Sequence, residues 1–538
     1  MGGGYLSWVP MLVRDCSDPS PFGKLRVGFQ TVGQRLQTRF TLAFPLMKQL
    51  LDLLRRNPWF FACVTLAALA LRLFFVFKFP SLFGDSFVYG DIAKNWMDKG
   101  IYGLTTAQGV HPTLIRLPGY PAFLALIFSI AGREHYTAVM IAQALIDTNT
   151  CLVIAALALE LMNARAARAA YVLSALCPFT AMYVAAPLTE TLAICATAHA
   201  LYYGVRGIKV KALAGVTLSA AKGKACSRNP DPEAAEGEGA RDRSLLLWLL
   251  AGAWTAVGIL LRPDGGLVLA ALGLGLTVLF FRGRKLQVLL AGAVLIVASL
   301  APLVPWTIRN WRTFHVIQPL APRYANDPGD FVPHGFNRWI KTWMVDYVSV
   351  HEIYWRGDNE AIDANLLPER AFDSRREYDG THALLDDYND QLTLNPQLDA
   401  RFEQLAEERI NHNPFRYYVW LPSLRIASMW FRPRTETLPI ESRWWEFENH
   451  PEESAFALAW AALNLFFVLA AVRGWMQSRL GLCGAVVIGF VLLRSAFLGS
   501  VESPEPRYVL ECFPVVLALV GGAFAWRTAG GGFNWKGI

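Results

Sequence analysis

The chain has 538 residues, of which 54% are apolar, 13% aromatic and 17% charged, and its formal net charge is +7. Soluble proteins carry roughly 25% charged residues, so this composition is too apolar for a soluble fold of this length. The apolar and aromatic content also excludes disordered and fibrous chains. Several uninterrupted apolar runs reach the roughly 20 residues that cross a bilayer as a helix. The sequence therefore predicts a polytopic membrane protein, whose excess of Lys and Arg belongs in cytoplasmic loops and does not indicate nucleic-acid binding.

Ten apolar segments are expected to cross the membrane as helices. They lie near residues 59–79, 137–162, 169–186, 188–205, 244–261, 265–281, 286–306, 455–472, 480–498 and 508–526. One more apolar run, at 118–132, is short and holds two prolines and two glycines. If this run crossed the membrane, every later Lys- and Arg-rich loop would change sides, against the positive-inside rule. We therefore expect residues 118–132 to form a juxtamembrane helix at the outer interface.

This topology predicts an all-α polytopic protein with about ten transmembrane helices, amphipathic juxtamembrane helices and a small, mainly helical domain on the outer face. Residues 1–58 form a basic cytoplasmic tail, and residues 59–306 form the transmembrane module. Within that module, 80–136 is an outer-face loop and 206–243 is a cytoplasmic loop. An external domain is expected at 307–454, including an aromatic-rich interfacial helix at 415–431. The chain then closes with the C-terminal helices and tail at 455–538.

Ionisable residues gather at the outer ends of the expected spans. Residues 84–100 predict an amphipathic helix that begins at Asp85, where a carboxylate can also serve simply as a helix cap. Arg116 precedes a Pro-Gly-Tyr-Pro turn on the same side. The other clusters on this face are Thr189-Glu190, Arg262-Pro263-Asp264, Arg309-Asn310 with Arg312, and Glu502, Glu505, Arg507 and Tyr508 before the last span. Carboxylates at such depth are costly unless they are paired or used, so these clusters mark this face as the functional one.

Taken together, these clusters resemble the GT-C superfamily of membrane glycosyltransferases that use lipid-phosphate sugars. The nearest group is of the family 39 type, with protein O-mannosyltransferases and lipid A aminoarabinose transferases. The resemblance covers residues 59–320 well and the C-terminal third loosely. Many members carry a glutamate after the first aspartate, where this chain has Ser86. The residues that match the family pattern are Asp85, Tyr89, Ala93, Gly100, Arg116, Pro118, Tyr120, Thr189, Glu190, Arg262, Pro263, Pro305, Trp306, Arg309, Asn310, Arg507 and Tyr508.

The resemblance implies transfer of a sugar from a polyprenyl-phosphate donor to an acceptor hydroxyl, on the periplasmic face of a bacterial inner membrane. It implies that Asp85 is the general base and that inversion occurs at the anomeric carbon. The leaving phosphate would be bound by arginines, with Arg116 ranked first, followed by Arg262, Arg309 and Arg507. Tyr89, Tyr120 and Glu190 would contact the substrates.

The implied partners are the polyprenyl-phosphate sugar, a lipid, glycan or protein acceptor, and membrane lipids, but no nucleic acid. No cofactor is certain from the sequence. A divalent metal ion stays open, with His111 and His334 as external residues able to contribute to its binding.

Three other functions stay open at the level of sequence. A flippase or transporter for a lipid-linked sugar could use polar residues inside the spans, namely Arg72, Gln143, Asp147, Asn149 and Glu160. The chain shows no repeated halves of the kind common in secondary transporters. An O-antigen ligase or polymerase would instead use a diphosphate-linked donor. A non-catalytic scaffold is disfavoured by the ionisable clusters on the outer face.

Overall fold

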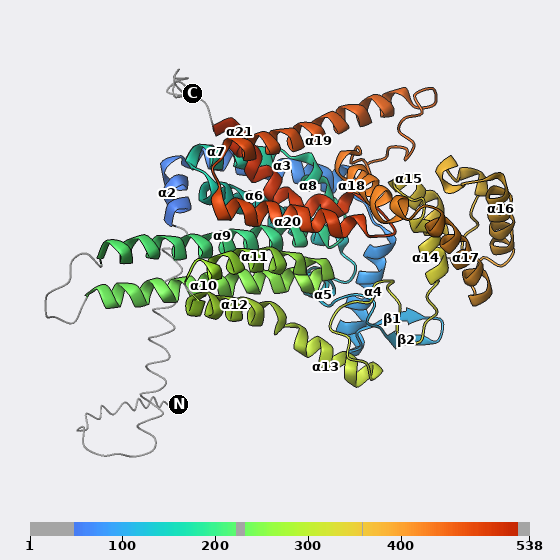
Figure 1. Cartoon of the computed structure of the whole chain (residues 1–538), viewed down its shortest axis with the longest axis horizontal. Helices are drawn as coiled ribbons and strands as arrows, with labels where there is room; N and C mark the ends of the chain where they lie inside the picture. The colour runs from blue at the N-terminus through green and yellow to red at the C-terminus, as the bar shows by residue number, and fades with distance from the viewer. Residues whose placement is uncertain (1–47, 222–231, 284, 358, 526–538) are drawn as a thin grey trace, which may run out of the picture. The chain divides into compact units, whose positions relative to one another are not determined.

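The computed structural model describes residues 48–221, 232–283, 285–357 and 359–525 (Figure 1). The chain divides into two compact units, Met1–Pro58 and Trp59–Ile538. The described part of the first unit holds the short helix α2 (Lys48–Arg56), which ends on Arg55 and Arg56. The elements discussed below belong to the second unit, apart from Pro58 at the beginning of α3.

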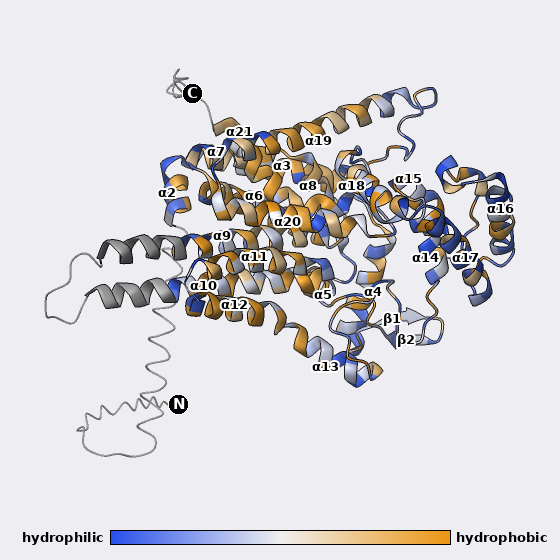
Figure 2. Ribbon diagram, in the orientation of Figure 1, coloured by the Kyte–Doolittle hydropathy of each residue, from blue (hydrophilic) through white to orange (hydrophobic). Residues whose placement is uncertain are grey.

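Seven helical segments among the described residues are long and apolar enough to cross a membrane. A helix suits this role because it satisfies every backbone amide internally, where lipid offers no hydrogen-bond partner. Figure 2 shows that hydrophobic residues predominate along these long helices. The segments are α3 (Pro58–Lys78), α6 (Tyr136–Leu161), the Asp242–Leu261 part of α10 (Pro232–Leu261), η3 with α11 (Pro263–Gly266 and Leu267–Phe281), α19 (Pro451–Gln477), α20 (Gly481–Gly499), and η9 with α21 (Pro506–Cys512 and Phe513–Ala525).

Two further spans are bent pairs of helices. The first pair joins α7 (Ala164–Ala175) to α8 and η2 (Pro178–Ala181 and Met182–Ala185) with a bend of 49°. The second joins α12 (Lys285–Leu300) to α13 (Leu303–Phe314) with a bend of 42°. A proline follows each helix that ends at a break: Pro178 is the first residue of α8, and Pro302 directly precedes α13. A proline cannot continue a helix because its ring clashes with the preceding turn.

The seven segments and two bent pairs coincide with nine of the ten predicted crossings. The tenth, at 188–205, lies on α9 (Glu190–Ala221), a helix of 32 residues that packs against α6 and α10. Helix α9, which carries Glu190, His199 and Arg206, is not among the described segments that are apolar enough to cross by the same measure. The predicted all-α polytopic fold is confirmed, and the chain is a multi-pass integral membrane protein.

The apolar run at 118–132 forms helix α5 (Gly119–Ala131), as predicted. With 13 residues this helix is about 20 Å long, which is shorter than the roughly 30 Å hydrocarbon core of a bilayer. Its length agrees with the expectation that it does not cross the membrane. Buried Tyr120, Leu124 and Phe128 lie on one side of α5, where they belong to the same hydrophobic cluster as Tyr89 of α4 (Gly84–Lys99).

Helix α21 lies at the centre of the bundle, since its residues 513–522 are all buried. Two glycines permit its close approach to neighbouring helices. A Cβ added at Gly521 would lie 2.4 Å from the carbonyl oxygen of Ala166 in α7, and one at Gly474 of α19 would lie 1.9 Å from that of Leu519. Small residues at such crossings let backbones touch, which favours helix association in membranes.

At one end of the long helices lie α4 (Gly84–Lys99) and a hairpin of β1 (Gly103–Thr106) and β2 (Gly109–Pro112) (Figure 1). The helix predicted at 84–100 is confirmed, and it ends at Gly100 in the left-handed conformation, φ +68°. The antiparallel hairpin pairs Gly103 with Pro112 and was not predicted. Asp91 of α4 accepts hydrogen bonds from the backbone N and the hydroxyl of Thr105, which tie β1 to the helix.

Residues 315–450 form a small, mainly helical region at the same end of the bundle. Figure 2 shows that it is much more hydrophilic than the long helices. It has its own core, in which Trp339, Trp343 and Phe402 are completely buried. Its elements are α14 (His334–Lys341), α15 (Tyr347–Ser349), η4 (Val350–Tyr354), η5 (Trp355–Gly357), η6 (Ala364–Leu366), η7 (Glu369–Ala371), α16 (Arg375–Asn389), α17 (Pro396–His412), η8 (Arg416–Trp420) and α18 (Leu421–Phe431).

Candidate active site

A cavity of about 1280 Å³ lies where the α4 end of the bundle meets residues 315–450. Its wall is built from the ends of helices, which bring residues distant in sequence together. Five of the charged residues in the wall are Asp85 of α4, Arg116 before α5, Glu190 at the beginning of α9, Arg262 after α10 and Arg507 of η9. Six of the eight residues predicted for the site line this cavity, namely Asp85, Tyr89, Arg116, Glu190, Arg262 and Arg507.

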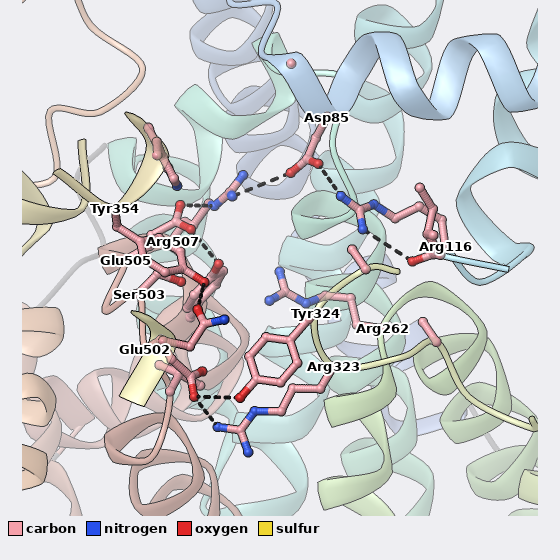
Figure 3. Close-up of a pocket in the computed structure, with 18 of the residues that line it drawn as sticks. Asp85, Arg116, Arg262, Arg323, Tyr324, Tyr354, Glu502, Ser503, Glu505 and Arg507 are labelled. Atoms are coloured by element: carbon pink, nitrogen blue, oxygen red, sulfur yellow. Dashed lines mark hydrogen bonds and ion pairs between the residues drawn. The ribbon is translucent and has the colours of Figure 1, made fainter. Parts of the chain in front are cut away.

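Asp85 lies between two arginines, as Figure 3 shows. Its Oδ1 accepts a hydrogen bond of 2.7 Å from Arg116 Nη2, and its Oδ2 is 3.7 Å from Arg507 Nη2. Burial raises the pKa of the Asp85 carboxyl, but the positive charges of Arg116 and Arg507 outweigh burial, so the pKa lies below its usual value. The side chain of Asp85 keeps 33% of its surface exposed, which leaves the ionised carboxylate open to the cavity.

The first turn of α4 places this carboxylate at the cavity. Helix α4 begins at Gly84, so Asp85 lies in the first turn, where the helix dipole favours a negative charge. Ser86 is fully buried, and its hydroxyl accepts a hydrogen bond of 3.3 Å from the backbone N of Phe83. Ser86 therefore closes the turn and does not face the cavity.

Tyr89 lies one helical turn after Asp85, and its ring packs against the guanidinium of Arg116. The Arg116 guanidinium is 5.8 Å from the centre of the Tyr89 ring, within the range of a cation–π contact. Burial raises the pKa of the Tyr89 phenol to about 12, so this side chain is neutral and can act as a hydrogen-bond donor. Tyr89 also packs edge-on against Tyr120, with 5.0 Å between the ring centres.

Glu190 and Arg262 form a second pair deeper in the wall. Arg262 Nη1 donates to Glu190 Oε1 at 3.0 Å, and Arg507 Nε lies 3.6 Å from the same oxygen. The other oxygen of Glu190 is buried without a hydrogen-bond partner among the described residues. Arg507 Nε is also 2.7 Å from Glu505 Oε2, and the Tyr508 hydroxyl donates to Glu505.

The opposite wall contains Arg323 and Tyr324, which the sequence did not single out, next to Glu502. Arg323 Nη2 is 2.5 Å from Glu502 Oε1, and the Tyr324 hydroxyl is 3.5 Å from the same oxygen (Figure 3). A second cavity of about 460 Å³ shares Arg323, Tyr324 and Glu502 with the first. Arg323 and Tyr324 lie in an irregular loop with no motif or periodicity, so no sequence signal pointed to them. Glu502 was part of a recognised acidic stretch.

Two predicted site residues lie outside the cavity wall. Tyr120 is fully buried, and its hydroxyl donates to Gln143 Oε1 at 2.7 Å. Arg309 donates to the backbone oxygens of Thr113 at 2.8 Å and Tyr102 at 2.6 Å. Its guanidinium also packs on the Tyr102 ring, 5.2 Å from the centre. In the structure, Arg309 therefore braces the backbone that leads to Arg116.

The ionisable groups that line the cavity are mixed in sign. Six carboxylates and four guanidinium groups are among the described lining residues: Asp85, Glu190, Asp264, Glu436, Glu502 and Glu505, with Arg116, Arg262, Arg323 and Arg507. Among the residues that the structure describes, no group of three or more His, Cys, Asp or Glu side chains is arranged to hold a metal ion. An anionic ligand would therefore bind at the Arg116, Arg262 and Arg507 side of the cavity, where the three arginines converge.

Residues 110–225 match the family model of dolichyl-phosphate-mannose-protein mannosyltransferases. This segment includes Arg116, Tyr120 and Glu190, and the match confirms the predicted resemblance to GT-C membrane glycosyltransferases over that part of the chain. No curated protein matches the chain.

Solved structures to which this chain is similar include that of the oligosaccharyltransferase AglB of Archaeoglobus fulgidus, in complex with an inhibitory peptide and a dolichol-phosphate. Its identity to this chain is 12%, with 87% of this chain and 50% of that chain covered and a TM-score of 0.45. This chain thus spans about half the length of the oligosaccharyltransferase. ArnT of Cupriavidus metallidurans bound to undecaprenyl phosphate is 14% identical, with 87% of this chain and 78% of that chain covered and a TM-score of 0.35.

Proposed function

We propose that this protein is a glycosyltransferase that moves a sugar from a polyprenyl-phosphate donor to a hydroxyl group of an acceptor. The observation that carries the proposal is the Asp85–Arg116 pair at the cavity, 2.7 Å apart, with Arg507 close to the same carboxylate. This arrangement combines an ionised base with positive charges at one site. Displacement of a sugar from a phosphate needs both of these groups.

In the proposed reaction, Asp85 accepts the proton of the acceptor hydroxyl while the acceptor oxygen attacks the anomeric carbon. The bond from that carbon to the phosphate oxygen breaks, and the lipid phosphate leaves with the electron pair. A single displacement of this kind inverts the anomeric centre. Arg116, with Arg262 and Arg507, offsets the charge that develops on the phosphate, since guanidinium groups match phosphate oxygens in pairs.

Binding of the donor would also prepare the base. Arg116 and Arg507 hold the pKa of Asp85 down against the effect of burial, and a carboxylate held in this way is a weak base. A phosphate that engages Arg116 draws its positive charge away from Asp85. The pKa of the carboxyl then rises toward the range in which it accepts a proton effectively. The base is therefore strongest when the donor is bound.

The acceptor would approach from the wall formed by Arg323, Tyr324 and Glu502, because this wall opens to the second cavity. Residues 307–454 would then act as an external domain that covers the site and selects a lipid, glycan or protein acceptor.

The proposed topology has residues 1–58 and 206–243 on the cytoplasmic side, 80–136 outside, and 455–538 closing the chain. This topology follows from the positive-inside rule, and with it the cavity would face the periplasm of a bacterial inner membrane.

A transport function finds less support in the described residues. Arg72 and Asp147 form a completely buried pair at 2.8 Å. Arg72 also donates to the backbone oxygens of Ala175 and Ser174. Gln143 is occupied by Tyr120 and two backbone oxygens, and Glu160 pairs with Arg206 at 3.1 Å. These side chains pack the bundle, and the two cavities described above do not include them.

The decisive experiment incubates the purified full chain in nanodiscs with a panel of polyprenyl-monophosphate sugars and acceptor extracts. Release of polyprenyl phosphate is measured, and Asp85→Asn is compared with Asp98→Asn. Asp98 lies on the same helix but pairs with Arg133 at an exposed position, so it serves as the matched control. We expect release with wild type and Asp98→Asn, and loss of release with Asp85→Asn.

Two results would contradict the proposal. One is release that is the same in the Asp85→Asn variant. The other is turnover only with diphosphate-linked donors, which would favour a ligase or polymerase. Movement of a labelled lipid-linked sugar across vesicle membranes, without transfer to any acceptor, would favour a flippase.

A further inference from the structure

The segment from Gly499 to Tyr508 joins α20 to η9 and supplies a large part of the cavity wall. Glu502, Glu505, Arg507 and Tyr508 all lie on it and line the cavity. Most of the segment lacks regular structure before the short η9 helix begins at Pro506. Its shape therefore depends on what holds its backbone.

Three buried arginines donate hydrogen bonds to the backbone of this segment. Arg425 reaches the carbonyl oxygen of Gly499 at 3.3 Å, Arg434 that of Pro506 at 2.5 Å, and Arg494 that of Tyr508 at 3.0 Å. At most 1% of each arginine is exposed. A hydrogen bond donated by a buried guanidinium is costly to lose, so these contacts hold the segment. One nitrogen of Arg494, Nη1, is buried without a hydrogen-bond partner among the described residues.

Arg494 differs from the other two arginines because it also binds two carboxylates that approach Arg262. Its Nη2 donates to Asp264 Oδ2 at 2.9 Å and to Glu511 Oε1 at 2.7 Å. The same two carboxylates approach Arg262 Nε, at 3.4 Å for Asp264 and 3.6 Å for Glu511. Asp264 and Glu511 thus lie between two arginines, of which Arg262 faces the cavity and Arg494 lies outside its wall.

We propose that Arg494 is a positioning residue that holds Arg262 and Arg507 in place to receive the donor phosphate. This inference rests on the proposed function. Without Arg494, Asp264 and Glu511 would have Arg262 as their shared cation and would draw its guanidinium away from Glu190. The backbone oxygen of Tyr508 would lose its donor, which would release the turn that carries Arg507.

The geometry requires an arginine at this position. The guanidinium presents Nε to the Tyr508 carbonyl while Nη2 reaches both carboxylates, and a lysine has a single nitrogen that cannot do both. Arg494→Lys keeps the positive charge but cannot make the full set of contacts. The substitution therefore separates positioning from simple charge balance.

The test compares Arg494→Lys with Arg72→Lys in the full chain. Arg72 is the matched control because it is also fully buried in a span and also pairs with a carboxylate, Asp147, but lies outside the cavity. Arg494→Lys should raise the KM for the polyprenyl-phosphate sugar about tenfold, as expected for loss of charge-assisted hydrogen bonds. Arg72→Lys should leave the KM of the folded fraction within about twofold.

Amide hydrogen exchange gives a second readout that does not depend on turnover. Exchange at residues 505–512 should become faster in Arg494→Lys and stay unchanged in Arg72→Lys. Equal effects of the two variants on KM, or unchanged exchange at 505–512, would overturn the inference. A wild-type protein with no turnover on any donor would overturn the proposed function, while the exchange measurement would still decide whether Arg494 holds the segment.

Glu511→Gln provides a second variant for the case in which Arg494→Lys does not fold. Glu511 lies outside the cavity wall, and its replacement removes one of the two carboxylates that bridge Arg494 and Arg262. We expect a smaller rise in the donor KM, with kcat changed less than KM. A donor KM equal to that of wild type would contradict the role of Glu511 in linking Arg494 to Arg262.

Discussion

Two Arg–Asp pairs in this protein have almost the same length and opposite surroundings. Arg72 and Asp147 are 2.8 Å apart, with 0% and 3% of their side chains exposed, and backbone oxygens occupy the other donors of the arginine. Arg116 and Asp85 are 2.7 Å apart, with 24% and 33% exposed, and they line a large cavity. An ion pair by itself therefore does not mark an active site. The distinguishing feature is whether a ligand can reach the pair and replace one partner.

The largest expected effect of this difference is on catalysis. Asp85→Asn removes the proton acceptor and keeps the shape of the side chain. We expect kcat to fall by about 10²- to 10⁴-fold, the usual contribution of a general base. The thermal midpoint should change little, because the pair is partly exposed to water. The measurement is polyprenyl phosphate release, and unchanged kcat would remove Asp85 from the mechanism.

The buried pair should show the reverse behaviour. Asp147→Asn leaves the Arg72 charge buried without a counter-charge, and breaking a buried pair costs about 3–5 kcal/mol in the free energy of unfolding. Unfolding in mixed micelles, followed by circular dichroism, measures this loss. The fraction that remains folded should keep the wild-type kcat. A stable Asp147→Asn protein with altered kcat would contradict the contrast between the two pairs.

Substitution of Arg116, the arginine that pairs with Asp85 in the cavity, should affect donor binding. Arg116→Lys keeps the charge but loses the paired donors that match a phosphate, so we expect the donor KM to rise about tenfold. The KM for the acceptor should stay close to that of wild type. Arg133→Lys is the control, because Arg133 pairs with Asp98 at an exposed position away from the cavity. A rise in acceptor KM alone would assign Arg116 to the other substrate.

A smaller effect is expected on the pH dependence of the reaction. Burial raises the pKa of Asp85, but Arg116 and Arg507 hold it below its usual value, so the base stays ionised at mildly acid pH. Arg116→Met removes one of the positive charges that lower this pKa, while Arg507 and Arg262 remain. The pKa of Asp85 then rises, and the acid limb of kcat/KM moves to higher pH by about 1 unit. A limb that stays in place would indicate that another group titrates.

The smallest change is expected for the ring under Arg116. Tyr89→Phe keeps the aromatic face and removes the hydroxyl. Because a cation–π contact at a partly exposed site contributes about 0.5–1 kcal/mol and survives this change, the donor KM should change by less than about threefold. Tyr89→Leu should have the larger effect. Equal KM values for the two variants would show that the ring does not support Arg116.

The sequence predicted the features that depend on local pattern and composition. Apolar runs located the spans, and the short apolar run at 118–132 forms the short helix α5. The family pattern brought Asp85 and Arg116 together although 31 residues separate them. Helix α9 shows the limit of hydropathy, since it carries Glu190, His199 and Arg206 and still packs against α6 and α10.

The sequence could not predict contacts that depend on how loops fold over one another. Arg309 follows a span and matched the family pattern, yet its donors are used by the backbone oxygens of Tyr102 and Thr113. Arg323 reaches Glu502, 179 residues further along the chain, from a loop without periodicity. Such partners are determined by tertiary packing, which a single sequence does not encode in a readable pattern.

The charge cluster around Arg494 also bears on how the protein is inserted into its membrane. Arg494 and Glu511 lie 17 residues apart, but Asp264 precedes Arg494 by 230 residues. A charged side chain inside a membrane span is costly while it is unpaired, so α20 inserts less readily before its arginine meets its partners. The helix gains its full set of counter-charges only when residues translated much earlier meet it in the lipid. Biogenesis of the last two helices is thereby linked to the correct assembly of the helices made before them.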